Sequence, residues 1–257
     1  MEPNHETPQD FWAELRRSTQ SRIGLGRAGD ALPTEQILEF RSAHAAARDA
    51  VHQPLDVDLL AGQVEAVGLG VAARVASRAT SRAEYLRRPD LGRLPADLSG
   101  VPHSGAEVGF VLADGLSPRA LADHGAALLS ALTSELADRY SLAPPVIATE
   151  ARVALGDHIA EALGVATVVV LIGERPGLSV ADSLGIYLTH LPRPGRTDAD
   201  RNCISNIHPP EGLGYQQAAH VVSGLLAGAR RLGRSGVDLK DTSRSDALAS
   251  GEVLTIE

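Results

Sequence analysis

The apolar stretch Thr167-Val168-Val169-Val170-Leu171-Ile172 and the polar turn after it, Gly173-Glu174-Arg175-Pro176-Gly177, decide the fold of this chain. A short run dominated by Val, Leu and Ile predicts a strand that is buried on both faces. A carboxylate, a guanidinium and a Pro-Gly pair stand directly at the carboxyl end of that strand. Open α/β sheets bind ligands at the carboxyl ends of their strands. The turn is therefore the first candidate for a functional site.

The same alternation of apolar runs and helical segments extends over residues 106–240. Strands are predicted over 108–113, 145–148, 167–172 and 185–191. One helix is predicted from 118 to about 139, a second follows the turn at 152–157 and ends at 163, and a third runs from 215 to about 232. A short helical bridge is predicted before 185, and a polar loop over 200–208. This pattern predicts an α/β fold, a Rossmann-like parallel sheet with flanking helices. Right-handed crossovers place the strand ends at one edge, so residues 114–117, 152–153 and 174–177 are expected to line a shared crevice.

Composition excludes several classes of function. The 257 residues are 44% hydrophobic and 22% charged, as is ordinary for a globular protein. A formal net charge of −8 argues against a sequence-independent nucleic-acid surface, which needs basic residues. The sequence has neither an apolar run of about 18 residues nor a signal peptide, so no membrane span is expected. A single cysteine forms no internal disulfide, and the cytoplasm is the expected location.

The region before the regular pattern is different in character. Residues 1–105 are predicted to be a smaller, mainly helical N-terminal region, followed by the Rossmann-like domain over 106–240 and a loose tail over 241–257. Within the N-terminal region, the segment Gly24-Leu25-Gly26-Arg27-Ala28-Gly29 has the spacing of a dinucleotide-binding motif. That motif follows a strand and opens a helix, but here a basic helical segment precedes it. We favour the alternative of an arginine-rich turn that docks on another surface.

The predicted crevice lacks the usual catalytic motifs. The sequence contains no G-x-S-x-G, no P-loop and no H-E-x-x-H. One possibility for acid–base catalysis is a carboxylate pair formed by Glu174 with Asp182, Asp198 or Asp200, and the sequence does not fix the separation of these groups. The edge is therefore predicted to bind a ligand rather than to catalyse a reaction.

Each candidate residue also has a purely structural interpretation. Glu174 beside Arg175 is compatible with a surface ion pair, which contributes little stability. Cys203 is compatible with a small buried residue, the usual role of a free cysteine. Val153 is compatible with a core position at the start of a helix.

Several longer motifs occur in one order between about residues 10 and 240. They are Leu15-Arg16-Arg17-Ser18-Thr19-Gln20-Ser21-Arg22-Ile23, Gly26-Arg27-Ala28-Gly29, Arg88-Pro89-Asp90-Leu91-Gly92-Arg93, Asp114-Gly115-Leu116-Ser117, Gly173-Glu174-Arg175-Pro176-Gly177-Leu178 and Arg201-Asn202-Cys203-Ile204-Ser205-Asn206-Ile207. Any one of them is a weak signal, but the set is specific. Together they resemble the small (light) subunit of ethanolamine ammonia-lyase.

The resemblance implies an adenosylcobalamin-dependent lyase that converts ethanolamine to acetaldehyde and ammonia. It implies that a large subunit binds the substrate and carries most of the chemistry. The small subunit, in a hetero-oligomer of paired large and small chains, closes over the cobalamin at the interface and has no catalytic or metal-binding residues of its own. Residues 1–105 are then expected to dock on the large subunit, and residues 106–240 to contact the cobalamin.

The resemblance also assigns site residues. The cobalamin contacts of the family match Val153 in the turn before a helix, Glu174 in the G-E-R-P-G turn and Cys203 in the C-I-S-N segment. Asp114 and Arg152 are secondary candidates from their position alone. A valine side chain suits the apolar face of a corrin ring, and a carboxylate is able to accept N–H donors from its peripheral amides.

The chain departs from the family in one respect. Some members carry a long N-terminal extension associated with microcompartment packaging or solubility, whereas only Met1–Asp10 precede Phe11 here. A cytoplasmic complex is expected, and packaging in a bacterial microcompartment is in doubt. The alternative function is a freestanding Rossmann-type nucleotide-binding or regulatory protein that uses the same crevice. The Cys203-Ile204-Ser205-Asn206 segment, and the lack of a predicted strand before Gly24, favour the enzyme subunit.

Overall fold

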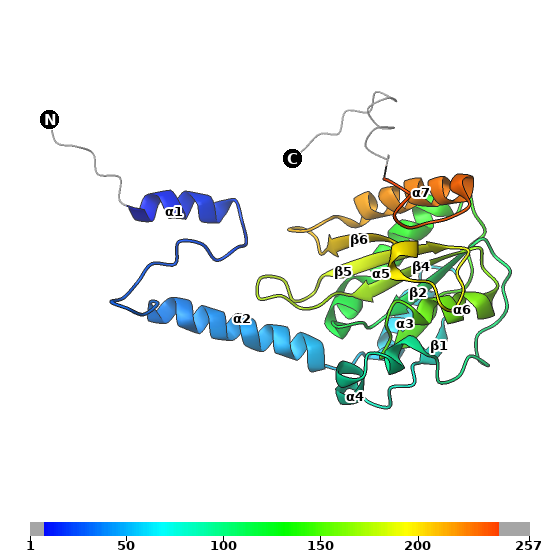
Figure 1. Ribbon diagram of the computed structural model, residues 1–257, viewed down its shortest axis with the longest axis horizontal. Helices are drawn as coiled ribbons and strands as arrows, with labels where there is room; N and C mark the ends of the chain where they lie inside the picture. Colours follow the sequence, from blue (N-terminus) through cyan, green and yellow to red (C-terminus); the bar gives the residue numbers. More distant parts are fainter. Residues whose placement is uncertain (1–7, 242–257) are drawn as a thin grey trace, which may run out of the picture.

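The computed structural model describes residues 8–241, which form a mixed six-stranded sheet with helices on both faces and a helical arm that projects from it (Figure 1). The strands are β1 (Ala73–Ala76), β2 (Val108–Ala113), β3 (Val146–Thr149), β4 (Thr167–Gly173), β5 (Leu184–His190) and β6 (Asn202–Ile207). The α-helices are α1 (Pro8–Arg17), α2 (Thr34–His52), α3 (Val57–Glu65), α4 (Arg82–Arg87), α5 (Pro118–Leu136), α6 (Leu155–Leu163) and α7 (Tyr215–Leu232), with short 3-10 turns at Leu91–Arg93 and Asp198–Asp200.

The α/β class is confirmed, but the prediction of a parallel sheet is wrong for its last two strands. The strand order is β1-β3-β2-β4-β5-β6, and the pairs among β1, β3, β2 and β4 are parallel. β5 runs antiparallel to β4 along its whole length, and β6 runs antiparallel to β5. The cause is the connection over 174–183, which is a loop rather than the predicted helical bridge. A parallel connection needs a crossover of about a dozen residues or more, usually a helix, whereas an antiparallel pair closes with a short loop.

Residues 200–208, predicted to be a polar loop, contain the edge strand β6 instead. At the other end of the sheet, β1 pairs with β3, and α3 contributes Leu60 and Val64 to the core. Residues from before the expected boundary at 105 thus lie in the same sheet as residues after it. The tail expected over 241–257 falls, apart from Asp241, outside the described residues.

The two faces of the sheet are covered unequally. Val169 and Leu171 of β4 point to the face covered by α3, α5 and α7, whereas Val168 and Val170 point to the face covered by α6. The long α5 begins as predicted, because the Ser117 side chain accepts a hydrogen bond from the helix and proline occupies its first turn. All seven residues of β4 are buried, as the central strand of a two-sided sheet requires.

The helical arm consists of α1, the segment that follows it and α2. Figure 1 shows α2 projecting from the sheet, and its buried residues, Ala47 and Ala50, lie towards its C-terminal end. Gly24, Gly26 and Gly29 have positive φ angles, and a Cβ on Gly24 would lie 2.3 Å from the Trp12 ring. The glycine-rich segment is therefore a turn between two helices and not part of a β-α-β unit, which removes the context that a dinucleotide site requires.

Candidate functional site

The carboxyl ends of β2, β3 and β4 meet at one edge of the sheet, as predicted. The N–H of Leu116, after β2, donates to the carbonyl of Gly173 at the end of β4, at 2.9 Å. Gly115 has φ +57, and a Cβ at this position would lie 2.2 Å from the same carbonyl oxygen. Only glycine permits this close approach of the two turns.

Asp114 is the buried centre of this edge. Its carboxylate accepts the N–H of Glu150 at 2.8 Å and the N–H of Ala151 at 2.9 Å, and it lies 3.4 Å from Nη1 of Arg82. Burial raises the pKa of Asp114 to about 7, against the lowering effect of these hydrogen bonds and of Arg82. The contacts fix the course of the chain between β3 and α6. Asp114 is thus an internal support of the edge rather than an exposed ligand.

Val153 and Arg152 occupy the turn that Asp114 supports. Val153 is half-buried and packs against the apolar cluster on the α6 face of the sheet, which includes Val170. The Arg152 guanidinium carbon lies 4.7 Å from the centre of the Tyr85 ring. Its Nε is buried and has no hydrogen-bond partner in the described part of the chain. An unpaired buried donor is uncommon in proteins, and this one lies beside a candidate contact residue.

Glu174 does not form the surface ion pair considered above, because no salt bridge joins it to Arg175. Its Oε2 accepts hydrogen bonds from the Ser183 hydroxyl and from the N–H of Asn206 at 3.2 Å. Its Oε1 lies over Gly185, where an added Cβ would be 3.0 Å away. The carboxylate therefore turns back over the start of β5 and the end of β6.

Cys203 is exposed on β6 and is not the small buried residue of the structural interpretation. It stands opposite Tyr187 of β5, and the Tyr187 hydroxyl is its hydrogen-bond partner. The protein atoms around the sulfur raise the pKa of the Cys203 thiol, and the negative charge of Glu174 adds to this effect, while the hydrogen bond from Tyr187 opposes it. Burial and the neighbouring Cys203 raise the pKa of Tyr187 to about 12. Both groups are therefore neutral near pH 7.

These residues border a half-covered face of the sheet, which we call the open face and define by Gly185, Tyr187, Cys203 and Ser205. The helices α5 and α7 pack on β5 and β6 from the opposite face. On the near side, α6 packs on β2 and β4, and Cys203 and Ser205 stay exposed. Cys203 is part of the open face, Glu174 lies over its Gly185, and Val153 borders the sheet from the side of α6.

A buried ion pair joins the two sides of this face. Arg201, immediately before β6, donates to both carboxylate oxygens of Asp157 in the first turn of α6, at 2.8 and 2.6 Å. It also donates to the Thr189 hydroxyl of β5 at 2.8 Å. Both charged side chains are 1% exposed. This bidentate geometry fixes β6 relative to α6.

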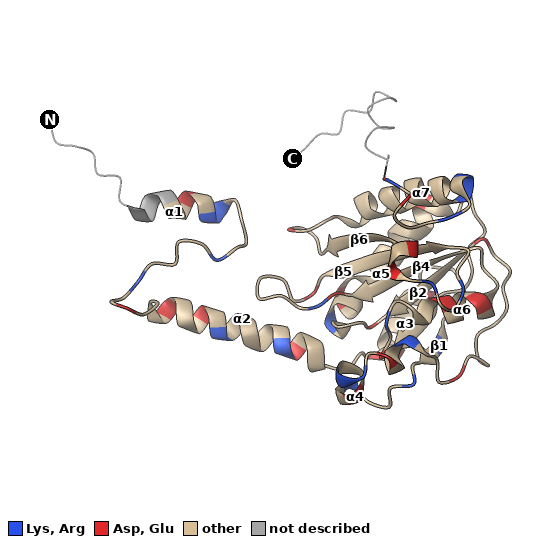
Figure 2. Ribbon diagram, viewed as in Figure 1, with Lys and Arg blue, Asp and Glu red and all other residues tan. Residues whose placement is uncertain are grey.

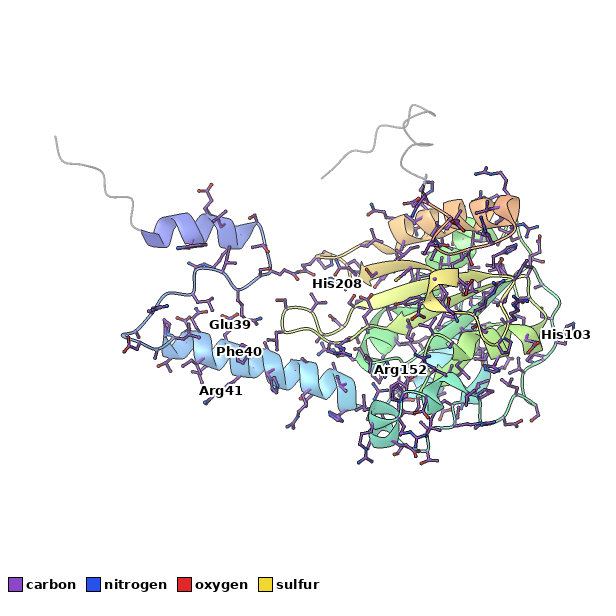
Figure 3. The ribbon with its side chains drawn as sticks, viewed as in Figure 1. Glu39, Phe40, Arg41, His103, Arg152 and His208 are labelled. Carbon is purple, nitrogen blue, oxygen red and sulfur yellow. The ribbon has the colours of Figure 1, made fainter. Side chains whose placement is uncertain are left out.

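The arm touches the loop that carries Glu174. Arg22 donates two hydrogen bonds to the carbonyl of Leu178 at 3.1 and 3.2 Å, and the Ser179 hydroxyl donates to the carbonyl of Gln20 at 3.2 Å. A shallow cavity of about 280 Å³ lies between α2 and this loop, lined by His44, Ala47, Arg48, Val51, His52, Pro176 and Leu178. Figure 3 shows Arg152 at the side of the sheet near α2, and Glu39, Phe40 and Arg41 on the projecting part of α2.

Sequence reasoning missed Tyr187, Ser183 and Arg82. The alternation of side chains along 202–207 was a signal for β6, and with β6 recognised Cys203 would have been placed in a strand. Over residues 8–241, no group of three or more His, Cys, Asp or Glu side chains is placed to bind a metal ion. Within the same range, no helix is long and apolar enough to span a membrane.

Comparison with known proteins decides the family. The sequence matches the profile of the family Ethanolamine ammonia-lyase light chain (EutC) over residues 9–240. This chain belongs to the ethanolamine ammonia-lyase light-chain family. It is 74% identical to the ethanolamine ammonia-lyase small subunit of Rhodococcus erythropolis over 96% of both chains. It is 48% identical to the small subunit of Rhodopseudomonas palustris over 94% of both chains, and 46% identical to that of Ralstonia nicotianae over 95% of this chain and 93% of the relative.

These similarities confirm the resemblance inferred from the sequence motifs. The chain is the small subunit of ethanolamine ammonia-lyase, a carbon–nitrogen lyase assembled with a large subunit. Ethanolamine ammonia-lyase is a cobalamin enzyme. The freestanding nucleotide-binding or regulatory protein is not favoured.

Proposed function

We propose that the open face and the turns beside it form this subunit's half of the adenosylcobalamin site, and that the large subunit supplies the other half. The observation that carries this proposal is the position of the three residues inferred from the family. Cys203 belongs to the open face and stays exposed, and Glu174 lies beside this face, over Gly185. Val153 lies just before α6 and packs against the apolar cluster on the α6 side of the sheet. A catalytic cleft of its own is not needed for this role.

The donor set fits a corrin ring with peripheral amides. Val153 offers an apolar contact, and both hydrogen bonds to Glu174 end on Oε2, which leaves Oε1 to accept an amide N–H. The unpartnered Nε of Arg152 is a donor for an amide carbonyl. Buried polar groups are normally hydrogen-bonded, so a ligand that completes these bonds is favoured at this edge.

The role that we assign to this chain is to hold, orient and cover the cofactor. Adenosylcobalamin, when bound, supplies the radical chemistry by which ethanolamine is converted to acetaldehyde and ammonia. The protein groups around a cofactor determine its orientation and shield it from water. Here Glu174 is fixed by Ser183 and Asn206, and the face beneath it is held by the Arg201–Asp157 pair. A rigid support of this kind is suited to positioning rather than to proton transfer.

We further propose that the N-terminal region docks on the large subunit, chiefly through the arm. Leu38 is 59% exposed and Phe40 is 47% exposed on α2. Large apolar side chains that stay exposed on a projecting helix are characteristic of protein–protein interfaces. Figure 2 shows positively and negatively charged residues mixed along α2, which suits a protein partner better than a nucleic acid. We place the complex in the cytoplasm because the single cysteine suits a reducing compartment.

The experiment that tests the site compares Glu174→Ala with Glu65→Ala in the reconstituted complex of both subunits. Glu65 ends α3, is exposed and lies on a helix that packs on the opposite face of the sheet, so it is a matched control. Cobalamin affinity is measured by visible absorbance and ammonia release by a coupled assay. Loss of one hydrogen bond to a charged group costs about 1.5–3 kcal/mol, so a rise in cobalamin Kd of at least about tenfold is expected for Glu174→Ala alone. Equal affinities for the two variants would refute the assignment.

A further inference from the structure

Arg82, the first residue of α4, lies where three distant segments of the chain meet. Its Nε donates to the carbonyl of Val51, in the last turn of α2, at 2.7 Å. Its Nη1 donates to the carbonyl of Gly115 at 2.9 Å, and lies 3.4 Å from Asp114 Oδ2 and 3.3 Å from Glu150 Oε2. One guanidinium therefore joins the arm to the turns that follow β2 and β3.

The turn after β3 needs this support. Glu150 has φ +51, in the left-handed region that residues other than glycine rarely adopt, so its surroundings must maintain the conformation. Asp114 accepts the N–H groups of Glu150 and Ala151, and the Tyr85 hydroxyl donates to the Ala151 carbonyl at 2.9 Å. Val153 follows in the same turn. Its position therefore depends on the groups that hold Glu150 and Ala151.

Tyr85 extends the network from Arg82 to Arg152. The two guanidinium carbons lie 4.9 and 4.7 Å from the centre of its ring, within the range of cation–π attraction. Nη2 of Arg82 and Nε of Arg152 are both buried without a hydrogen-bond partner among residues 8–241. The network is thus closely packed around the Tyr85 ring and contains two buried donors that are unpaired within the described residues.

We propose that Arg82 is a positioning residue for cobalamin binding, an inference that rests on the proposed function of the open face and the arm. Arg82 does not touch the cofactor and acts through the turn that carries Val153. Because it also holds the end of α2, it couples docking of the arm on the large subunit to the position of Val153. Coupling of two binding events is reciprocal, so the large subunit and cobalamin each strengthen the binding of the other.

The test uses Arg82→Gln and Arg82→Lys in the complete complex of both subunits, with Arg87→Gln as the control. Arg87 lies on the same helix, is exposed, and its Nε donates only to the carbonyl of Ala83. Arg82→Gln is expected to raise the Kd for adenosylcobalamin about tenfold, within the usual range of coupling between sites. Arg82→Lys, which keeps the charge but lacks the planar fork, restores part of the affinity. The KM for ethanolamine stays unchanged in both variants, and Arg87→Gln behaves as the unmodified complex.

A double-mutant cycle with Val153→Ala separates positioning from general destabilisation. If Arg82 acts through Val153, the effect of Arg82→Gln on the cobalamin Kd shrinks to within about twofold in the Val153→Ala background. An undiminished effect in that background, or an unchanged Kd for Arg82→Gln alone, would overturn the proposal. If circular dichroism shows that Arg82→Gln does not fold, Arg82→Lys is put through the same cycle with the same criteria. If Glu174→Ala loses affinity for cobalamin but the Arg82 variants do not, only the positioning role of Arg82 is refuted. If neither Glu174→Ala nor the Arg82 variants lose affinity for cobalamin, the proposed site itself is refuted.

Discussion

Gly185→Ala is a sharp test of how Glu174 is held, because it adds one methyl group beneath the carboxylate. The new Cβ would lie 3.0 Å from Oε1, 3.3 Å from Cγ and 3.4 Å from Cδ of Glu174. Contacts this short require the carboxylate to move by a few tenths of an ångström. The shift moves Oε1 and strains the hydrogen bond from Asn206, which is already 3.2 Å long.

The expected effect on the fold is small. Gly185 has no positive φ angle, so alanine fits its backbone conformation. Replacing such a glycine stabilises a protein by about 0.4–1 kcal/mol through the unfolded state, which offsets much of the strain at Glu174. We expect the free energy of unfolding to change by less than about 1 kcal/mol.

The expected effect on cobalamin binding is larger. A hydrogen bond to a charged group contributes about 1.5–3 kcal/mol, and a displaced acceptor loses part of it. Because 1.4 kcal/mol corresponds to a factor of ten, a loss near the lower limit raises the cobalamin Kd about tenfold.

The assay is titration of the reconstituted complex by visible absorbance. Gly62→Ala is the matched control, since an added Cβ there meets no atom within 4 Å. An unchanged Kd for Gly185→Ala would refute the role of Glu174, and a loss of stability above about 3 kcal/mol would refute the reasoning about strain.

Two further predictions concern the support of the open face and its thiol. Arg201→Met should lower the free energy of unfolding by about 3–5 kcal/mol in chemical denaturation, because it leaves Asp157 buried without its cation. Arg88→Met, which breaks an exposed pair with Asp90, should cost less than about 1 kcal/mol, and equal costs would contradict the buried geometry. Cys203 should react slowly with iodoacetamide at pH 8, and its rate should still rise beyond pH 9, because the thiol pKa lies above its ordinary value of 9.0 and only the thiolate reacts. The reaction should be blocked in the complex with cobalamin, and a rate that levels off below pH 8 would contradict the shift.

Local pattern predicted much of the fold. The buried strand β4 and the helix α7 were placed within one residue, because an apolar run and an amphipathic period are visible in a short window of sequence. Ser117 and Pro118 identified the start of α5 for the same reason. The direction of β5 was not visible locally. It depends on whether the connection over 174–183 folds as a helix, and it forms a loop.

The site was predicted in part. The meeting of the turns at 115 and 173 followed from strand direction alone. The position of Cys203 could not be predicted in this way, because β6 is an edge strand whose exposed polar residues resemble a loop in sequence. Arg82 was not identified from the sequence, because its partners lie at the distant positions 51, 114, 115 and 150. Contacts over such separations leave no periodic signal in a single sequence.

The most direct test of the central claim is to titrate the large subunit with adenosylcobalamin in the absence and in the presence of this chain. If the open face forms half of the site, adding the chain lowers the cobalamin Kd by about tenfold or more, and cobalamin tightens the association of the two subunits by the same factor. A cobalamin Kd that is the same with and without this chain would contradict the account.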